Sequence, residues 1–124
     1  MNNSSKNVLV VDDNSDAREM LAKMLEKLDW VPKSYESGQS ALDDMANKDY
    51  QIAFLDIMMP HMNGYELLEK IRAIPEYKEL PVIMVSAKDK DSEIMEGYQF
   101  GAALYITKPF TMKQIEYGIK MVLE

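Results

Sequence analysis

The strongest constraint on the fold of this chain is the regular alternation of short apolar runs with longer amphipathic segments. Five runs have the length of strands, the second being the weakest, and each is followed by apolar residues spaced as on one face of a helix. The runs cover 8–11, 30–35, 52–55, 82–85 and 104–106, and the helical patterns cover 17–28, 41–46, 67–74, 94–98 and 112–123. Successive strand–helix units of this length predict an α/β fold, a doubly wound five-stranded parallel sheet with right-handed connections.

Turn-forming and capping residues mark several boundaries between these elements. Asn14 or Ser15 suits the N-cap of the first helix, because a short polar side chain can accept a hydrogen bond from the first turn. The segment 58–64 contains Pro60 and an Asn-Gly pair, and it is expected to be a loop. Pro75 ends the third helical pattern, because proline interrupts a helix.

Length and composition limit the number of domains and the classes of function. The 124 residues make one ordinary domain, 1–124, whose polar residues 1–6 are expected to form a flexible tail. With no cysteine and one histidine, His61, the chain offers no disulfide, no thiolate nucleophile and no multi-histidine metal cage. The net charge of -7 disfavours direct nucleic-acid binding, because a phosphate backbone attracts a basic surface. Without a signal sequence or a run of roughly 20 apolar residues, we expect a cytoplasmic protein that does not enter a membrane.

Polar residues follow four of the five predicted strands at the point where each strand ends. They are Asp12 and Asp13 after the first strand, Asp56 after the third, Ser86 after the fourth, and Thr107 and Lys108 after the fifth. Because the carboxyl ends of parallel strands meet at one edge of a sheet, and ligands of such sheets bind there, we expect these side chains to converge.

The chemistry of this set points to a phosphoryl group. Two carboxylates ~4 Å apart repel each other by about 4 kcal/mol at an effective dielectric constant of roughly 20, so three of them need a cation. Oxygen ligands with room for water and phosphate favour Mg²⁺. An ionised aspartate can attack phosphorus, and a metal, an amine and a hydroxyl around it would stabilise the charge on the transferring group. The residues therefore predict capture of a phosphoryl group on a carboxylate.

Four segments of the chain match one family closely. They are VLVVDDN at 8–14, FLDIMMPHMNG at 54–64, PVIMVSA at 81–87 and GAALYITKPF at 101–110. In this order and spacing they resemble the receiver domain of bacterial two-component response regulators, including the chemotaxis-regulator type. The resemblance covers essentially the whole chain, and it implies a flavodoxin-like (βα)5 fold with strand order 2-1-3-4-5.

The resemblance also implies a role for each of the acidic residues. Asp56 would accept a phosphoryl group from a histidine kinase or a histidine phosphotransfer protein. Asp13 would bind Mg²⁺ directly and Asp12 would help, often through water. Asp56 and the backbone carbonyl of Met58 would complete the ligands, and Mn²⁺ can substitute.

The remaining residues of the matching segments would read out the phosphorylation. Ser86 would hydrogen-bond the aspartyl phosphate and Lys108 would pair with it. Tyr105 would turn inward when Ser86 moves, and the Lys108–Pro109 bond would be cis. The resemblance thus implies a switch and not a turnover enzyme. Phosphorylation would change the face made by the fourth helix, the fifth strand and the fifth helix. An output partner of unknown identity would bind this face, and a phosphorylation-dependent homodimer is a further candidate.

Two residues, at positions that influence the lifetime of the phosphate, depart from the family pattern. Met58 lies two positions after Asp56, and Lys88 lies two positions after Ser86. In this family these positions flank the attacking water and tune the lifetime of the phosphate. A bulky apolar side chain and a cation there leave the lifetime open.

Each candidate residue also has an interpretation that involves no chemistry. Asp12 and Asp13 can stabilise the start of the first helix through its dipole. Ser86 can cap the fourth helix, Lys108 can be a solvated loop residue, and Tyr105 can belong to the core. Their joint occurrence at strand ends favours a functional site.

Three other classes of function compete with the switch. A phosphohydrolase with an aspartyl nucleophile would need a second aspartate where the chain has Met58. A constitutive interaction module would not need the acidic residues together with Ser86 and Lys108. A nucleotide-binding protein is disfavoured because the five glycines form neither a G-x-G-x-x-G nor a P-loop pattern.

Overall fold

A computed structural model describes residues 6–87 and 101–124 of the chain. Five parallel strands form one sheet in the order β2-β1-β3-β4-β5, which confirms the predicted fold class and strand order. The strands are β1 (Asn7–Val11), β2 (Val31–Tyr35), β3 (Ile52–Asp56), β4 (Val82–Ser86) and β5 (Leu104–Thr107). The helices are α1 (Ser15–Lys27), α2 (Gly38–Met45), α3 (Gly64–Arg72), the 3-10 turn η1 (Pro75–Tyr77) and α5 (Met112–Leu123).

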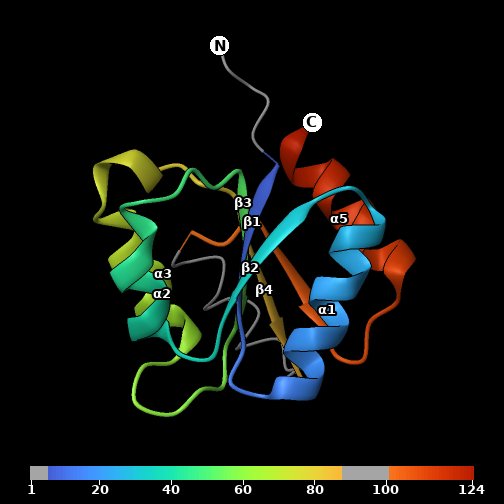
Figure 1. Cartoon of the computed structure of the whole chain (residues 1–124), viewed down its shortest axis with the longest axis horizontal. Helices are drawn as coiled ribbons and strands as arrows, with labels where there is room; N and C mark the ends of the chain where they lie inside the picture. The colour runs from blue at the N-terminus through green and yellow to red at the C-terminus, as the bar shows by residue number, and fades with distance from the viewer. Residues whose placement is uncertain (1–5, 88–100) are drawn as a thin grey trace.

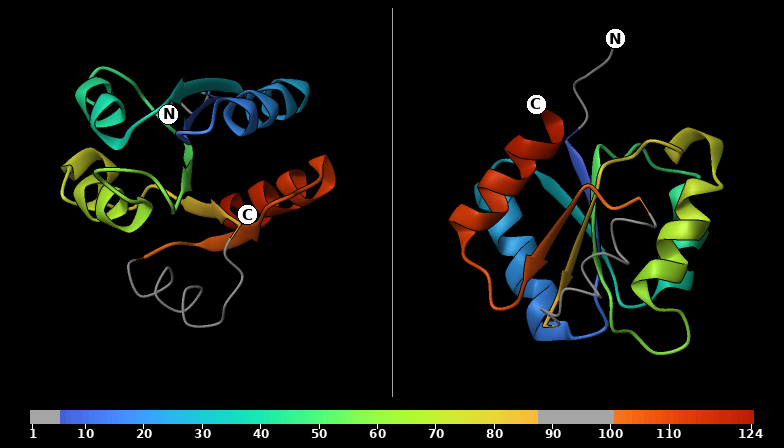
Figure 2. Two further views of the ribbon diagram at one scale, coloured as in Figure 1. Left: turned by 90° about the horizontal axis from the view of Figure 1, so that it is seen from below. Right: turned by 180° about the vertical axis from the view of Figure 1, so that it is seen from behind.

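The described helices lie on both faces of the sheet. In Figure 1, α2 and α3 cover one face and α1 and α5 cover the other, and α1 contacts α5 as α2 contacts α3. The views in Figure 2 show the two helical layers from below and from behind. Because all strands run in one direction, their carboxyl ends lie at one edge of the sheet, and α5 ends at the opposite end of the molecule (Figure 1).

Alternate side chains of each central strand enter two separate hydrophobic clusters. In β1, Leu9 and Val11 pack with residues of α2 and α3, whereas Val8 and Val10 pack with residues of α1 and α5. The strands β3 and β4 divide in the same way. Burial on both faces explains why the central strands are continuous apolar runs without a polar alternation.

The start of α3 differs from the sequence prediction. Asn63 is its N-cap: the Asn63 side chain accepts a hydrogen bond from the Glu66 backbone N–H, and the Glu66 side chain accepts one from the Asn63 backbone N–H, each at 2.9 Å. This reciprocal capping box replaces the expected turn at the Asn-Gly pair. The predicted loop 58–64 therefore ends one residue earlier, and Gly64 is the first residue of the helix.

Other boundaries are close to those predicted. Asn14 caps α1, as one of the two predicted candidates, by accepting a hydrogen bond from the Ala17 N–H at 2.9 Å. The α2 helix begins before the predicted apolar positions, because Ser37 caps it and Gly38 starts it. The strand β2 contains Pro32 and lies at an edge of the sheet, where the missing N–H of a proline is tolerated.

Three predictions fall wholly or partly outside the described residues. They concern the fourth helix at 94–98, Lys88, and residues 1–5 of the predicted tail. The last residue of that tail, Lys6, contacts the fold: its carbonyl accepts a hydrogen bond from the Val31 N–H at 2.9 Å, and its amine lies 4.4 Å from the ring centroid of Trp30. Within the described residues, no helix has the length and apolar character that crossing a bilayer requires.

Candidate functional site

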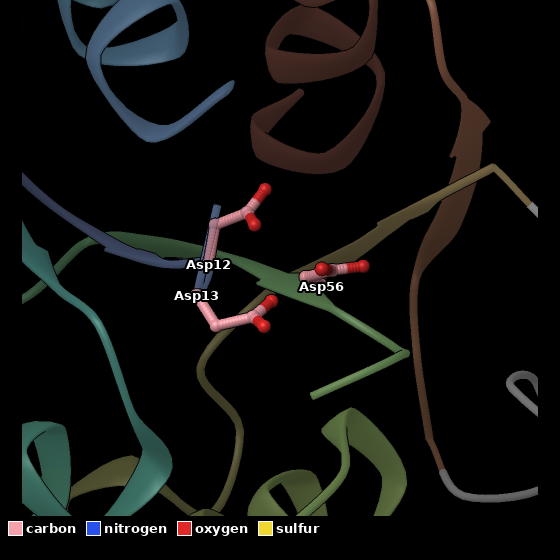
Figure 3. A group of neighbouring side chains, drawn as sticks. All are labelled: Asp12, Asp13 and Asp56. Carbon is pink, nitrogen blue, oxygen red and sulfur yellow. The ribbon is translucent and has the colours of Figure 1, made fainter. Parts of the chain in front are cut away.

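Three carboxylates meet at the carboxyl edge of the sheet. Asp12 and Asp13 directly follow β1, and Asp56 is the last residue of the neighbouring strand β3. One oxygen of each lies within 4.8 Å of the others, and Figure 3 shows the three side chains side by side. Asp12 and Asp56 are buried, with 4% and 6% of their surfaces exposed, whereas Asp13 is exposed. We call Asp12, Asp13 and Asp56 the acidic cluster.

Lys108 directly follows the edge strand β5 and supplies a positive charge to the acidic cluster. Its amine lies 2.9 Å from Oδ2 of Asp12 and 3.6 Å from Oδ2 of Asp56. Its backbone N–H donates to the carbonyl of Ser86 at 2.8 Å, which ties the end of β5 to the end of β4. The Lys108–Pro109 peptide bond is cis, as predicted. Lys108 is therefore a partner of the cluster and not a solvated loop lysine.

Asp12 is held by hydrogen bonds that the sequence does not predict. The Asn14 backbone N–H donates to Oδ1 of Asp12 at 2.9 Å, and the Asp12 N–H donates to the carbonyl of Tyr35 at 3.1 Å. The guanidinium of Arg18 donates to the carbonyl of Asp12 at 2.7 Å. No sequence motif predicts these contacts, because each of them involves a backbone atom.

The environment of Asp56 raises its pKa from the ordinary value of 3.8 to about 7. Burial is the first cause, because it disfavours the charged form, and the negative charge of Asp12 is the second. The charge of Lys108 and a 3.3 Å hydrogen bond from the Met58 backbone N–H to Oδ1 lower the pKa, but they only partly offset the rise. The Asp56 carboxyl is therefore more basic than an ordinary aspartate and is partly protonated near neutral pH.

The raised pKa predicts that ionised Asp56 costs stability. A group with a higher pKa in the folded chain stabilises the fold fully below its unfolded pKa of 3.8, and this contribution is lost as the pH rises through about 7. Without divalent cations, we expect Asp56→Asn to raise the free energy of unfolding by about 1–2 kcal/mol at pH ~8 and by little at pH ~4. The gain is smaller than the full pKa shift would give, because solvent reaches the acidic cluster at Asp13 and screens its charges. Urea unfolding at the two pH values measures this difference. Equal effects at both would contradict the raised pKa.

The other predicted site residues lie on the same edge or close behind it. Ser86 is fully buried at the end of β4, the strand next to Asp56, and it is in register with Thr107 of β5. Tyr105 is half-buried, pairs with Met84, and packs against the hydrophobic cluster on the α2 and α3 side. Met58 follows Asp56 with 56% of its surface exposed.

The donor set of the acidic cluster fits a hard divalent cation. All three side chains offer oxygen ligands, and two of them are buried at the distance where their mutual repulsion is large. Oxygen-only sites with few carboxylates favour Mg²⁺ or Mn²⁺ over softer metals. The exposed side at Asp13 leaves room for water or for oxygens of another molecule.

Comparison with known proteins identifies the family. A model of the response regulator receiver domain matches residues 8–120, which is nearly the whole chain. This chain belongs to the response regulator receiver domain family. Phosphorylation and Mg²⁺ binding at an acidic pocket are characteristic of this family of two-component regulators, and the acidic cluster lies where such a pocket requires carboxylates.

Relatives of this receiver domain include curated regulators about twice its length and solved chains of about its own length. The transcriptional regulatory protein SrrA of Staphylococcus aureus is 33% identical over 119 residues, which are 96% of this chain and 48% of SrrA. The chain thus spans about half the length of the curated relatives it matches. The chemotaxis protein CheY4 of Vibrio cholerae superposes with a TM-score of 0.91 at 25% identity, over 96% of this chain and 99% of CheY4. A putative response regulator of Chloroflexus aurantiacus gives 0.91 at 29% identity, over 97% and 98%.

Proposed function

We propose that this receiver domain is a signalling switch in which Asp56 accepts a phosphoryl group from a phosphohistidine donor. The observation that carries the proposal is the meeting of three carboxylates, with oxygens within 4.8 Å, two of which contact the amine of Lys108. Among these carboxylates Asp56 is buried at the end of a central strand beside the Lys108 amine, and an ionised carboxylate can attack phosphorus.

Four groups would hold a divalent cation beside Asp56. They are the carboxylates of Asp12, Asp13 and Asp56 and the backbone carbonyl of Met58. When bound, Mg²⁺, or Mn²⁺ in its place, would neutralise charge on the carboxylates and on the phosphoryl oxygens. Because Lys108 already contacts Oδ2 of Asp12, its amine is placed to pair with further negative charge arriving at Asp56.

The transfer itself requires one nucleophilic oxygen and one leaving nitrogen. An oxygen of ionised Asp56 forms a bond to phosphorus, and the phosphorus–nitrogen bond of the donor histidine breaks, with its electron pair remaining on the imidazole. The Lys108 amine and the Ser86 hydroxyl then pair with the phosphoryl oxygens. A histidine kinase or a histidine phosphotransfer protein would supply the phosphohistidine.

The output of the switch is proposed to lie on the face that contains β5 and α5, together with the fourth helix, which is outside the described residues. A hollow of about 290 Å³ on this face is lined by Leu104–Thr107, Gln114, Tyr117 and Met121. Tyr105 lines it and also packs against the core, so a change in its position would alter the hollow. An output partner or a second phosphorylated copy would bind here.

A turnover phosphatase is less well supported by the same site. The position two residues after Asp56, where such an enzyme needs an acid, carries the exposed thioether of Met58. Among residues 6–87 and 101–124, the acidic cluster is the one group of at least three close acidic or histidine side chains. We therefore propose stoichiometric phosphorylation of the chain rather than turnover of a phosphate ester.

Incubation with acetyl phosphate tests the proposal without a protein donor. We expect intact-mass spectrometry to show the gain of one phosphoryl group with Mg²⁺ and no gain with an excess of chelator. Peptide mapping should place the group on the peptide that contains Asp56. Uptake that is unaffected by chelation, or a group mapped to another peptide, would contradict the proposal.

A further inference from the structure

Each of the four polar groups of Asp12, two in the main chain and two in the side chain, makes a hydrogen bond. Its N–H donates to the carbonyl of Tyr35, its Oδ1 accepts from the Asn14 N–H, and its Oδ2 accepts from the Lys108 amine. The fourth contact is made by the guanidinium of Arg18, whose Nη1 donates to the Asp12 carbonyl at 2.7 Å. A hydrogen bond from a charged donor at this distance is about twice as strong as a neutral one.

The position of Arg18 in α1 is unfavourable by local rules. The helix begins at Ser15, so Arg18 lies in its first turn, where the positive end of the helix dipole disfavours a cation. Helical side chains point back toward the N-terminus, which brings this guanidinium over the loop that carries Asp12. Positions that break a local rule often serve a site, and here the contact with Asp12 offsets the unfavourable placement.

The Asp12 carbonyl belongs to the peptide group that leads into Asp13. Asp13 is exposed, and within residues 6–87 and 101–124 its carboxylate has no hydrogen bond or ion pair. The direction of this carboxylate therefore depends on the backbone that precedes it. Arg18 fixes that backbone on the carbonyl side, while the hydrogen bond to Tyr35 fixes the N–H side of Asp12.

We propose that Arg18 is a positioning residue of the cation site, which holds the peptide between Asp12 and Asp13 so that the Asp13 carboxylate faces the acidic cluster. This inference rests on the proposed function, because it assumes that the cluster binds a cation. It concerns a residue that makes no contact with the cation and acts through the backbone. Residues that orient metal ligands in this way typically change metal affinity about 10–100-fold when they are replaced.

Two roles of Arg18 predict opposite changes in cation affinity. If the guanidinium acted only as a nearby positive charge, its removal would strengthen the binding of a cation. If it positions Asp13, its removal weakens binding, and the loss persists when salt screens charges. At about 1 M NaCl the Debye length is roughly 3 Å, so the two roles separate clearly there.

The test is isothermal titration of Mg²⁺ into the parent chain and into Arg18→Met at about 1 M NaCl. We expect the dissociation constant of the variant to be about tenfold higher. Arg18→Lys keeps a cationic donor, and it should bind Mg²⁺ more tightly than Arg18→Met but less tightly than the parent. If Arg18→Met does not fold, the Lys variant is compared with the parent alone, and unchanged affinity overturns the inference.

Arg72 offers a matched control in the same chain. Its guanidinium also donates to backbone carbonyls, those of Tyr77 at 3.3 Å and Gly101 at 2.9 Å, but it makes these contacts away from the acidic cluster. Arg72→Met should lower the melting temperature without changing Mg²⁺ affinity. Equal or tighter Mg²⁺ binding by Arg18→Met, or an equal loss in both variants, overturns the positioning role while the proposed function stands. A parent chain that binds no Mg²⁺ overturns both.

Discussion

Asp56→Asn is expected to take up no phosphoryl group from acetyl phosphate with Mg²⁺, under conditions in which the parent chain is modified stoichiometrically. The amide nitrogen and oxygen of asparagine are poor nucleophiles toward phosphorus, whereas the ionised carboxylate can form an acyl phosphate. The substitution keeps the size of the side chain in a position with only 6% exposure, so the fold should persist. Intact-mass spectrometry of both proteins over a time course measures the effect.

The stability of the same variant separates a loss of chemistry from a loss of fold. Burial and the charge of Asp12 raise the pKa of Asp56, so Asp56→Asn should be more stable than the parent near neutral pH. Asp29→Asn is the matched control, because Asp29 is an exposed carboxylate in the loop after α1, and asparagine tolerates its φ of 70° equally well. The control should take up phosphate as the parent does. Parent-like uptake by Asp56→Asn would refute the assignment of the acceptor.

The sheet and the acidic cluster could be predicted from the sequence because both depend on strand ends. Continuous apolar runs such as 8–11 and 52–55 fit strands that are buried on both faces, and the structure buries both runs. In a parallel sheet the residue after each run lies at one edge. That rule alone brought Asp12, Asp56 and Lys108 together, although 96 residues separate the first from the last.

The start of α3 is predictable from a capping-box spacing in the sequence. Asn63 is followed three residues later by Glu66, which is the spacing of a capping box. The Asn-Gly pair by itself favours a turn, because glycine is common in turns and asparagine is common in both turns and caps. The pair serves the helix instead, since Asn63 caps it and Gly64 allows its first turn to approach β3 closely.

The contacts of Arg18 and Tyr35 with Asp12 could not be predicted in the same way. Each involves a backbone carbonyl, and every residue in the chain has one. The raised pKa of Asp56 could not be predicted from the sequence either, because it depends on burial and on Asp12, which only the fold brings close. The sequence indicates which chemical groups meet, but the distances and the supporting hydrogen bonds depend on tertiary structure.

Gly64→Ala should lower the free energy of unfolding by about 2–3 kcal/mol. A Cβ at this position would overlap the Asp56 carbonyl oxygen and lie 2.9 Å from the Cα of Ile57, and both are backbone atoms that cannot rotate away. The Gly64 N–H also donates to the Ile57 carbonyl at 2.9 Å, which holds the helix start against the end of β3. Relieving the clash must therefore displace either α3 or the end of β3 that carries Asp56.

Gly118→Ala is the control for this prediction, because it also adds a methyl group to a buried helical glycine. Its Cβ would meet the ends of two side chains, Leu104 Cδ2 at 3.0 Å and Ile106 Cδ1 at 3.3 Å, which can shift by a few tenths of an ångström. Alanine also gains roughly 1 kcal/mol of helix propensity, so the net change should lie within about 1 kcal/mol of zero. Urea unfolding compares the two variants, and the acetyl phosphate reaction should be slowed only in Gly64→Ala. Equal stability of Gly64→Ala and Gly118→Ala would show that the close approach of α3 to the end of β3 does not resist an added methyl group.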